Sequence, residues 1–397
     1  MNHPLCILLA LVTGMPPAFS QPRFSEKIDF PTGEGPTSLA LGDLNGDEMT
    51  DIVTANYRSG SLSVLIGTVA RDSSQPSFLL KRDLAVGENP MAVAVADLNG
   101  DGRPEIVAAN YISNSISIFV NTTAKGSRAP SFAAREDIRT GERPYAISIV
   151  DFNGDGRPDI VVVDYKSTAV SVFLNATHPG DTSISLEERI DLPAQARPVA
   201  VAVGDLNGDG KPDIVVANYR SDSLSVFLSK TMPGAHKPSF SKPFIVAAGS
   251  RPMSVGVCDI NDDGKPDIVV SDDGSNAVRV LINETPKGDS IPSFVMKAEL
   301  LTGLNPQVVC CPDLNHDGAP DIVTADYNSG SLSIFFNTTR PGDESPSFST
   351  RRELKTGTAP SSVAVGVLGE MFGEILCVAN YGSNSLSVFS VINAPPR

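Results

Sequence analysis

The chain of 397 residues has no tryptophan, four histidines and only five cysteines. Domains built on disulfides are short and rich in cysteine, so this composition excludes a disulfide scaffold. One cysteine lies in the N-terminal segment. The other four lie in apolar segments, where we expect small buried side chains: Cys258, Cys310, Cys311 and Cys377.

Basic residues are also scarce, since 31 lysines and arginines stand against 46 aspartates and glutamates, and the formal charge is −15. Such an acidic chain argues against nucleic acid or an anionic membrane surface as the partner, because both repel negative charge. The same excess of carboxylates suits a protein that binds cations.

Long hydrophobic runs are missing beyond the N-terminus, which argues against a transmembrane helix. Residues 1–20 contain no acidic residue, lysine or arginine, residues 5–12 are apolar, and Ala18 and Ser20 are small. We therefore expect residues 1–20 to be a secretory signal peptide, although the usual positive charge at its start is absent. A disordered or membrane-tethered start is the alternative. The mature protein would be secreted, periplasmic or held at the cell surface.

A repeat of 54 residues runs through the remaining chain. Seven copies account for essentially all of residues 21–397, so we expect this region to be a single domain without a linker. The repeat is marked by a proline that recurs in every copy, at Pro36, Pro90, Pro144, Pro198, Pro252, Pro306 and Pro360.

Each copy contains four short apolar segments separated by turn residues, and none shows a sustained helical period. In the second copy we expect strands at residues 91–96, 105–111, 115–120 and 131–138. Four strands in a copy of this length are typical of a propeller blade. The sequence therefore predicts an all-β fold, a seven-bladed β-propeller of four-stranded blades.

The first strand of each copy has apolar residues on both faces and a central small residue, which suits the innermost position near the crowded axis. The mature chain begins with a strand of the fourth type, residues 24–30, and ends after one of the third type, residues 385–391. We expect the N-terminal strand to complete blade seven and close the ring. An open solenoid would need polar capping repeats, and none is visible.

Six copies carry an acidic loop of nine residues between their first and second strands; the third to fifth read DFNGDGRPD, DLNGDGKPD and DINDDGKPD. Carboxylates this close together repel one another unless a cation binds. Oxygen ligands in a flexible loop suit Ca²⁺ better than Mg²⁺. We expect side-chain oxygens from positions 1, 3, 5 and 9 and the backbone carbonyl of position 7.

These loops predict up to six calcium ions. The expected metal ligands are Asp43, Asn45, Asp47 and Asp51; Asp97, Asn99, Asp101, Arg103 and Glu105; Asp151, Asn153, Asp155, Arg157 and Asp159; Asp205, Asn207, Asp209, Lys211 and Asp213; Asp259, Asn261, Asp263, Lys265 and Asp267; and Asp313, Asn315, Asp317, Ala319 and Asp321.

An EF-hand has a glutamate at position 12 of its loop and a helix on each side, and these loops have neither. Acidic turns without a metal are the remaining alternative. We expect the first loop to bind most weakly, because Glu48 stands where a glycine allows the sharp bend. The seventh copy has Val367 at position 1, and we expect no metal there.

The pattern G-x-x-P-x-x-V/I-x-x-x-D-x-N-x-D-G-x-P-D-I-V-V-A-N resembles the FG-GAP or VCBS repeats of integrin α-subunit heads and many secreted bacterial proteins. The resemblance extends over residues 24–391. It implies a seven-bladed propeller with calcium in the loops between the first and second strands. Members of the family include adhesion heads, lectins and lyases, so the resemblance implies no particular ligand or reaction.

No nucleophile motif, phosphate loop or dinucleotide fingerprint is present, and the histidines do not follow the repeat. We therefore predict a non-enzymatic, monomeric adhesion or ligand-binding module, without catalytic residues, whose partner is an unknown protein or glycan. We expect the turn faces and the loops at residues 67–75 and 229–237 to select that partner. A calcium-dependent lectin is the alternative, and a polysaccharide lyase or hydrolase has less support.

The sequence leaves open the roles of two further sets of residues. Tyrosines after the second strand could stack on sugars or pack on their own turns, with Asp273 in the missing place: Tyr57, Tyr111, Tyr165, Tyr219, Tyr327 and Tyr381. Asparagines of Asn-x-Thr triplets are either glycosylation sites or turn residues: Asn121, Asn175, Asn283 and Asn337.

Overall fold

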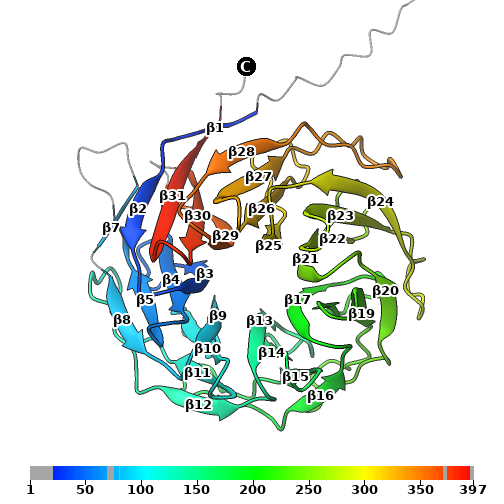
Figure 1. Cartoon of the computed structure of the whole chain (residues 1–397). Coiled ribbons are helices and arrows are strands. Elements are labelled where there is room, and N and C mark those ends of the chain that lie inside the picture. The colour runs from blue at the N-terminus through cyan, green and yellow to red at the C-terminus, as the bar shows by residue number, and fades with distance from the viewer. Residues whose placement is uncertain (1–20, 69–75, 80, 370–372, 394–397) are drawn as a thin grey trace, which may run out of the picture.

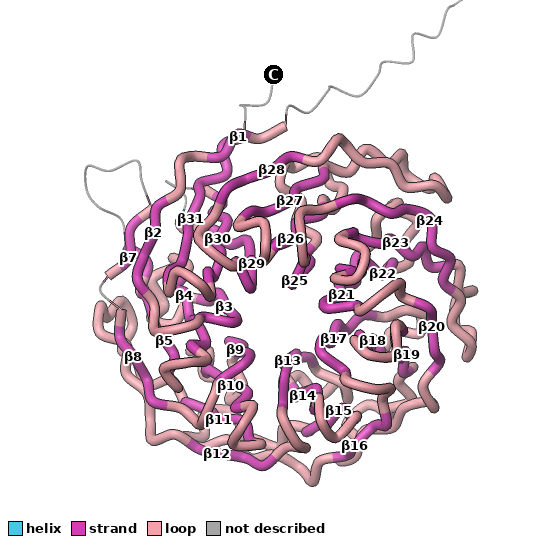
Figure 2. Tube along the Cα trace, in the orientation of Figure 1, coloured by secondary structure: helices cyan, strands magenta, loops and turns pink. Residues whose placement is uncertain are grey.

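The computed structural model of the chain describes residues 21–68, 76–79, 81–369 and 373–393. The expected signal peptide, residues 1–20, lies outside this part. Seven antiparallel sheets of four or five strands stand in a ring with their inner strands facing a common axis (Figure 1). A small eighth sheet pairs β6 (Gly67–Thr68) with β7 (Ser77–Phe78). Every element with defined bounds is a strand, and the tube view shows strands joined by short loops (Figure 2). The predicted seven-bladed, all-β propeller is confirmed.

The first six blades follow one plan, with strands in chain order from the axis outward. From the inside, they hold β3 (Pro36–Gly42), β4 (Asp51–Asn56), β5 (Ser61–Leu65) and β8 (Arg82–Ala85); β9 (Pro90–Ala96), β10 (Glu105–Asn110), β11 (Ser115–Phe119) and β12 (Glu136–Arg139); β13 (Pro144–Val150), β14 (Asp159–Asp164), β15 (Ala169–Phe173) and β16 (Ile190–Pro193); β17 (Pro198–Gly204), β18 (Asp213–Asn218), β19 (Ser223–Phe227) and β20 (Phe244–Ala247); β21 (Pro252–Cys258), β22 (Asp267–Asp272), β23 (Ala277–Asn283) and β24 (Phe294–Leu301); and β25 (Pro306–Cys310), β26 (Ile322–Asp326), β27 (Ser331–Phe335) and β28 (Arg352–Lys355).

Blade seven is completed by the start of the chain. Its own strands are β29 (Pro360–Val367), β30 (Glu374–Asn380) and β31 (Ser385–Ile392). Two short N-terminal strands, β1 (Arg23–Phe24) and β2 (Ile28–Pro31), pair antiparallel with β31 and supply the outer strand. The predicted ring closure is therefore confirmed, and no open edge remains between the first and last blades.

The hydrophobic core is divided into seven clusters, each between two neighbouring blades. Between blades four and five, for example, Val215 of β18 and Ile268 of β22 are completely buried in one cluster. Because both faces of each blade are covered, the second strand is apolar on both sides. This explains the continuous Val, Ile and Ala runs of the repeat.

The outer strand differs from expectation. We expected one strand over residues 131–138 of the second blade, but β12 begins only at Glu136. Phe132 instead forms an isolated bridge with Asn121, and the chain leaves the ladder between the two pairings. The outer strand has a neighbour on one side only, so an interruption there costs few hydrogen bonds. Blade five is the exception, because β24 is continuous with one register shift.

The antiparallel order of strands gives the ring two different ends. The loops from the first to the second strand and from the third to the fourth lie at one end, which we call the acidic end. The loops from the second to the third strand and from the fourth strand to the next blade lie at the other, the tyrosine end. Within the described residues, the structure has no helix long and apolar enough to span a membrane.

Candidate metal-binding loops and channel mouth

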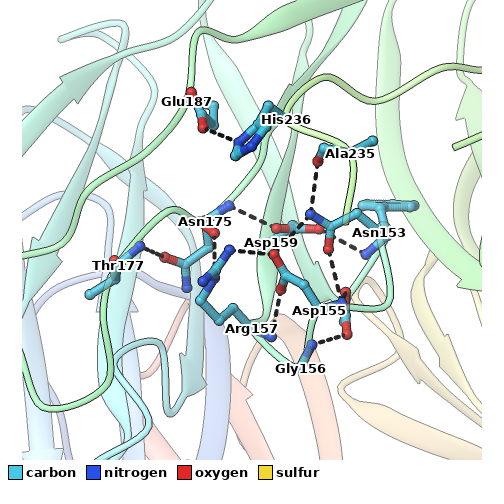
Figure 3. A network of polar contacts seen from close by, with 12 residues as sticks. Asn153, Asp155, Gly156, Arg157, Asp159, Asn175, Thr177, Glu187, Ala235 and His236 are labelled. Atoms are coloured by element: carbon cyan, nitrogen blue, oxygen red, sulfur yellow. Dashed lines mark hydrogen bonds and ion pairs between the residues drawn. The ribbon is translucent and has the colours of Figure 1, made fainter. Parts of the chain in front are cut away.

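The acidic loop of blade three shows how the predicted ligands are arranged (Figure 3). Asp151 accepts hydrogen bonds from the backbone N–H groups of Asp155 and Gly156, at 3.2 and 2.8 Å. The Oδ1 atoms of Asn153 and Asp155 accept further N–H groups of the same loop. The side chains at positions 1, 3 and 5 are therefore held together by the backbone of one loop.

The acidic residue at position 9 lies deeper. Asp159 is fully buried, and its two carboxylate oxygens accept the N–H groups of Phe152 at 2.8 Å and Asn175 at 2.7 Å. It thereby ties the start of the loop to the end of the third strand. Burial, the largest cause, raises the pKa of Asp159 to about 7, and the carboxylates of Asp151 and Asp155 raise it further against the backbone hydrogen bonds.

The same arrangement recurs around the ring. In every acidic loop the position-nine carboxyl accepts two backbone N–H groups, and burial with neighbouring carboxylates raises its pKa to about 7. The six residues are Asp51, Glu105, Asp159, Asp213, Asp267 and Asp321.

The donor chemistry of these loops fits a hard divalent cation, because carboxylates, one carboxamide and a backbone carbonyl supply only oxygen. In the fifth loop the buried Oδ1 atom of Asn261 has no hydrogen-bond partner, as a ligand atom facing a cation would lack one. Among the described residues, no three or more carboxylate, imidazole or thiol side chains form a metal site on their own. A bound ion would therefore depend on the carboxamide and carbonyl oxygens as well.

The basic side chains at position 7 have a role that the sequence did not predict. We expected only their backbone carbonyls to matter. In the structure Arg103, Arg157 and Lys211 pair with the position-five carboxylates of their own loops. Each of these basic side chains offsets part of the negative charge of its own acidic loop. These ion pairs are partly exposed, so they contribute little to stability by themselves.

The first and seventh loops depart from this plan. Glu48 has φ of 67°, the left-handed conformation that glycine adopts at the same position in the next five loops. A glutamate in this conformation is strained, whereas a glycine adopts it freely. In the seventh copy the described positions Val367, Gly369 and Ile375 carry no oxygen in their side chains.

Neighbouring blades hold the first five acidic loops in place through their position-three asparagines. The Nδ2 of Asn153 donates to the carbonyl of Ala235, and the Gly234 N–H donates to the Asn153 carbonyl at 2.7 Å. Residues 234 and 235 belong to the loop between the third and fourth strands of blade four. Part of that loop, predicted at 229–237 to select a partner, thus also contacts blade three. Residues 69–75 of the corresponding first loop lie outside the described part.

The Asn-x-Thr asparagines are a second inter-blade connection. Asn175 is 1% exposed, and its Nδ2 donates to the carbonyls of Leu98 in blade two and Pro158 in the acidic loop of its own blade, at 2.7 and 3.0 Å. Asn121, Asn283 and Asn337 make the equivalent contacts. Both amide hydrogens are used, so the structure favours the turn and packing role over a glycan at these positions.

The tyrosines gather at the other end, around a central cavity of about 530 Å³. Tyr57, Tyr111, Tyr145, Tyr327 and Tyr381 line it. Ring centroids of neighbours are close, with Tyr327 and Tyr381 at 6.1 Å. Sequence reasoning had found the tyrosines after the second strand but missed Tyr145, which begins an inner strand and lies outside that set.

Arginine side chains lie over several of these rings. The guanidinium of Arg58 is 4.2 Å from the ring centre of Tyr381, and that of Arg143 is 5.3 Å from the ring centre of Tyr111. In blade five, Asp273 replaces the tyrosine, and its carboxylate accepts a hydrogen bond from the Tyr219 hydroxyl. Arginines recur just before the repeat proline in blades three to five, a signal that could have been read from the sequence.

Comparison with known proteins decides the family. The model of the FG-GAP-like repeat matches residues 43–108, 97–162, 151–216 and 205–270, which together cover more than half of the chain. The chain belongs to the FG-GAP-like repeat family. The matched segments extend from one acidic loop into the second strand of the following blade, so the family pattern contains the candidate metal-binding loops.

Several curated proteins resemble this FG-GAP-like chain. A T-cell immunomodulatory protein homolog of Plasmodium yoelii yoelii is 25% identical over 262 residues, 58% of this chain and 37% of the relative. Integrin alpha-IIb of Mus musculus is 29% identical over 251 residues, 57% of this chain and 24% of the relative. The chain thus spans about a third or less of the length of these relatives. They support an integrin-like propeller of the adhesion type.

Solved structures agree on the fold. The BBS1N chain of a complex with ARL6DN covers 95% of this chain with a TM-score of 0.60 and 15% identity, and 98% of its own length is matched. A putative 6-phosphogluconolactonase from Bacteroides uniformis covers 82% with a TM-score of 0.55 and 16% identity, and 87% of that chain is matched. At such identities the likeness concerns the propeller alone.

Proposed function

We propose that this protein is an exported, calcium-binding propeller that acts as a non-enzymatic adhesion or ligand-binding module. The observation that carries the proposal is the rim of tyrosines, several beneath arginine side chains, around the central cavity at the tyrosine end. Tyrosine and arginine are the residue types that contribute most to protein–protein interfaces. The integrin and T-cell immunomodulatory relatives support the same kind of role.

Calcium is the proposed cofactor, with one ion in each of the six acidic loops. Crowded carboxylates with raised pKa, an all-oxygen donor set and the unpartnered Asn261 Oδ1 support it. Calcium per chain should be measured by elemental analysis after equilibrium dialysis. We expect six ions in the native protein and five after the paired change Asp205→Asn with Asp209→Asn. A native protein without bound calcium would contradict the proposal.

Ligand binding should be tested with the purified propeller immobilised in calcium and exposed to cell-surface extracts, with captured proteins identified by mass spectrometry. The matched control is a double variant, Arg143→Ala with Arg197→Ala, which removes two guanidinium groups that lie over tyrosine rings. A specific partner should be captured by the native protein and lost from the variant. Capture that is equal for both proteins would place the ligand elsewhere.

A calcium-dependent lectin is the second candidate, because a rim of aromatic rings could also stack on sugar rings. The tyrosines contact one another and the arginines, which leaves fewer free ring faces for a sugar. A glycan array in the presence of calcium tests this candidate. Binding that disappears after Tyr111→Ala would favour the lectin over the protein-binding module.

Export is proposed from the character of residues 1–20 and from the extracellular setting that the integrin relative suggests. Expression of the full chain with a C-terminal tag, followed by N-terminal sequencing of the exported protein, tests it. We expect the mature protein to begin near Gln21. Retention of the full-length chain inside the cell would contradict export.

A further inference from the structure

Two cysteines face each other between blades five and six. Cys258 is the last residue of β21, and Cys311 directly follows β25. Both belong to the cluster that fills the space between these two blades, and both are half-buried. The largest influence on the Cys258 thiol is a hydrogen bond with Cys311, which together with burial raises its pKa well above the ordinary value.

The geometry of this pair can be read from the equivalent positions of other blades. One repeat before Cys258 stands Gly204, and one repeat before Cys311 stands Val257. A Cβ atom placed on Gly204 would lie 3.6 Å from the Cβ of Val257. The same construction on Gly42 gives 3.6 Å to the Cβ of Val95. Blades one and two and blades four and five thus present the same short separation.

That separation lies within the range of a disulfide, in which the two Cβ atoms are about 3.5–4.5 Å apart. In the other two blade pairs a glycine provides the space that the larger partner needs. Between blades five and six both positions carry a sulfur instead. By analogy with these blade pairs, the two Cβ positions face each other across the interface at a separation that a disulfide can bridge.

We propose that Cys258 and Cys311 form a disulfide that links blade five to blade six. The two thiols lose two protons and two electrons as the S–S bond forms. A disulfide oxidant, such as oxidised glutathione, takes them up as its own S–S bond breaks into two thiols. The expected reaction is slow near neutral pH, because thiols with a raised pKa are seldom deprotonated.

The remaining cysteines have no such partner among the described residues. Cys310 precedes Cys311 on the chain, and because neighbouring side chains of a strand alternate, it packs in the cluster between blades six and seven. Cys377 is fully buried between blades seven and one. The fold therefore places the two possible competitors, Cys310 and Cys377, in other inter-blade spaces and leaves one pairing.

The test begins with the purified native chain after incubation with oxidised glutathione. Free thiols are blocked with iodoacetamide in denaturant, and the protein is digested without reduction for mass spectrometry. We expect Cys310 and Cys377 to be alkylated, and a single linked peptide pair to contain Cys258 and Cys311. Alkylation of all four cysteines, or fragment spectra that place the link on Cys310 or Cys377, would overturn the proposal.

Two variants that should still fold provide a second test of the link. Cys258→Gly and Cys311→Val introduce the residues that the ring itself uses at Gly204 and Val257, so both should fold. Each should abolish the linked peptide and leave one additional alkylated cysteine. The matched control Cys377→Ser should retain the link. A disulfide that survives Cys311→Val would show that Cys258 pairs elsewhere.

Discussion

The two ends of this propeller are built from the same repeat but use their polar residues in opposite ways. At the acidic end, carboxylates and asparagines turn inward and bond to backbone groups of their own loop and of the neighbouring blade, as Asn175 does with Leu98. At the tyrosine end, rings such as that of Tyr111 surround a cavity, and guanidinium groups such as that of Arg143 lie over the rings.

We therefore expect the acidic end to stabilise the fold and the tyrosine end to bind a partner. A buried polar group that makes all its hydrogen bonds stabilises the fold. Its removal is costly, because its partners are then buried without a hydrogen bond. A half-exposed ring or guanidinium at a cavity mouth contributes little to folding and is free to contact a partner. Changes at the acidic end should therefore unfold the protein, whereas most changes at the tyrosine end should alter binding alone.

Removal of calcium should have the largest effect on the acidic end. A ligand present at about 100 times its Kd stabilises the folded state by roughly 2.7 kcal/mol per site. With several loops occupied, we expect excess EDTA to lower the melting temperature by more than about 10 °C. Scanning fluorimetry with and without EDTA measures this, and excess calcium should restore the original value. An unchanged melting temperature would argue against bound calcium.

The inter-blade asparagine should come next. Asn175→Ala removes three hydrogen bonds and leaves two carbonyls and the Thr177 N–H without this partner, so we expect the free energy of unfolding to fall by about 3 kcal/mol. Urea denaturation measures the loss. Asn175→Ser is the conservative control, because Ser229 occupies the equivalent position in blade four, and it should cost less. Exposed Asn328→Ala should cost less than about 0.5 kcal/mol.

One buried acid at the tyrosine end, Asp164, should be an exception, because we expect its replacement to increase the stability of the fold. Asp164 ends the second strand of blade three, where Asn110 stands in blade two, and burial raises its pKa to about 6. The Ser171 hydroxyl contacts both Asp164 and Asp191, and one hydrogen cannot serve two carboxylates. An asparagine could donate to Ser171, as Asn110 donates to Ser117.

The sign of the pH effect follows from the raised pKa. The folded protein holds the Asp164 proton more tightly than the unfolded chain, so stability falls as pH rises from about 4 to about 6. Asp164→Asn removes this penalty, and we expect a gain of about 2 kcal/mol at pH 7.5 that vanishes near pH 4. Asp272→Asn is the contrast, because it breaks the ion pair with Arg279 and should destabilise. No gain at pH 7.5 would show that the carboxylate is ionised without cost.

The smallest effect on stability is expected for the arginines that lie over the tyrosine rings around the central cavity. Arg143→Ala should change the free energy of unfolding by less than about 0.5 kcal/mol, because Ala359 occupies the equivalent backbone position with φ of 55°. Affinity for a partner captured at the tyrosine end should nevertheless fall at least about tenfold. Surface plasmon resonance compares it with Arg128→Ala, an exposed arginine of the acidic end. Equal affinities for the two variants would remove the proposed distinction between the ends.

The strands of the inner and middle blade positions were predictable because their pattern is local. Short apolar runs bounded by turn residues predicted the first, second and third strands of the second blade to within one residue, as β9 and β11 illustrate. The outer strand was less predictable, because it has a neighbour on one side only and its pairing is interrupted between Phe132 and Glu136.

The candidate site was only partly predictable for the same reason. The residues of each acidic loop lie within nine positions, so their contacts with one another follow from the sequence. The bonds from Asn153 to Ala235 and from Asn175 to Leu98 join residues 82 and 77 positions apart. No pattern within one repeat indicates that these residues meet.

The sequence alone determined the period, the number of blades, the closing N-terminal strand and the composition of the acidic loops, because these depend on residues within one repeat or on the count of repeats. Only the tertiary structure decided which residues face each other between blades, including the asparagine connections and the approach of Cys258 to Cys311. Those contacts depend on the angle and height at which one twisted sheet packs on the next, and a repeating pattern of side chains does not specify either.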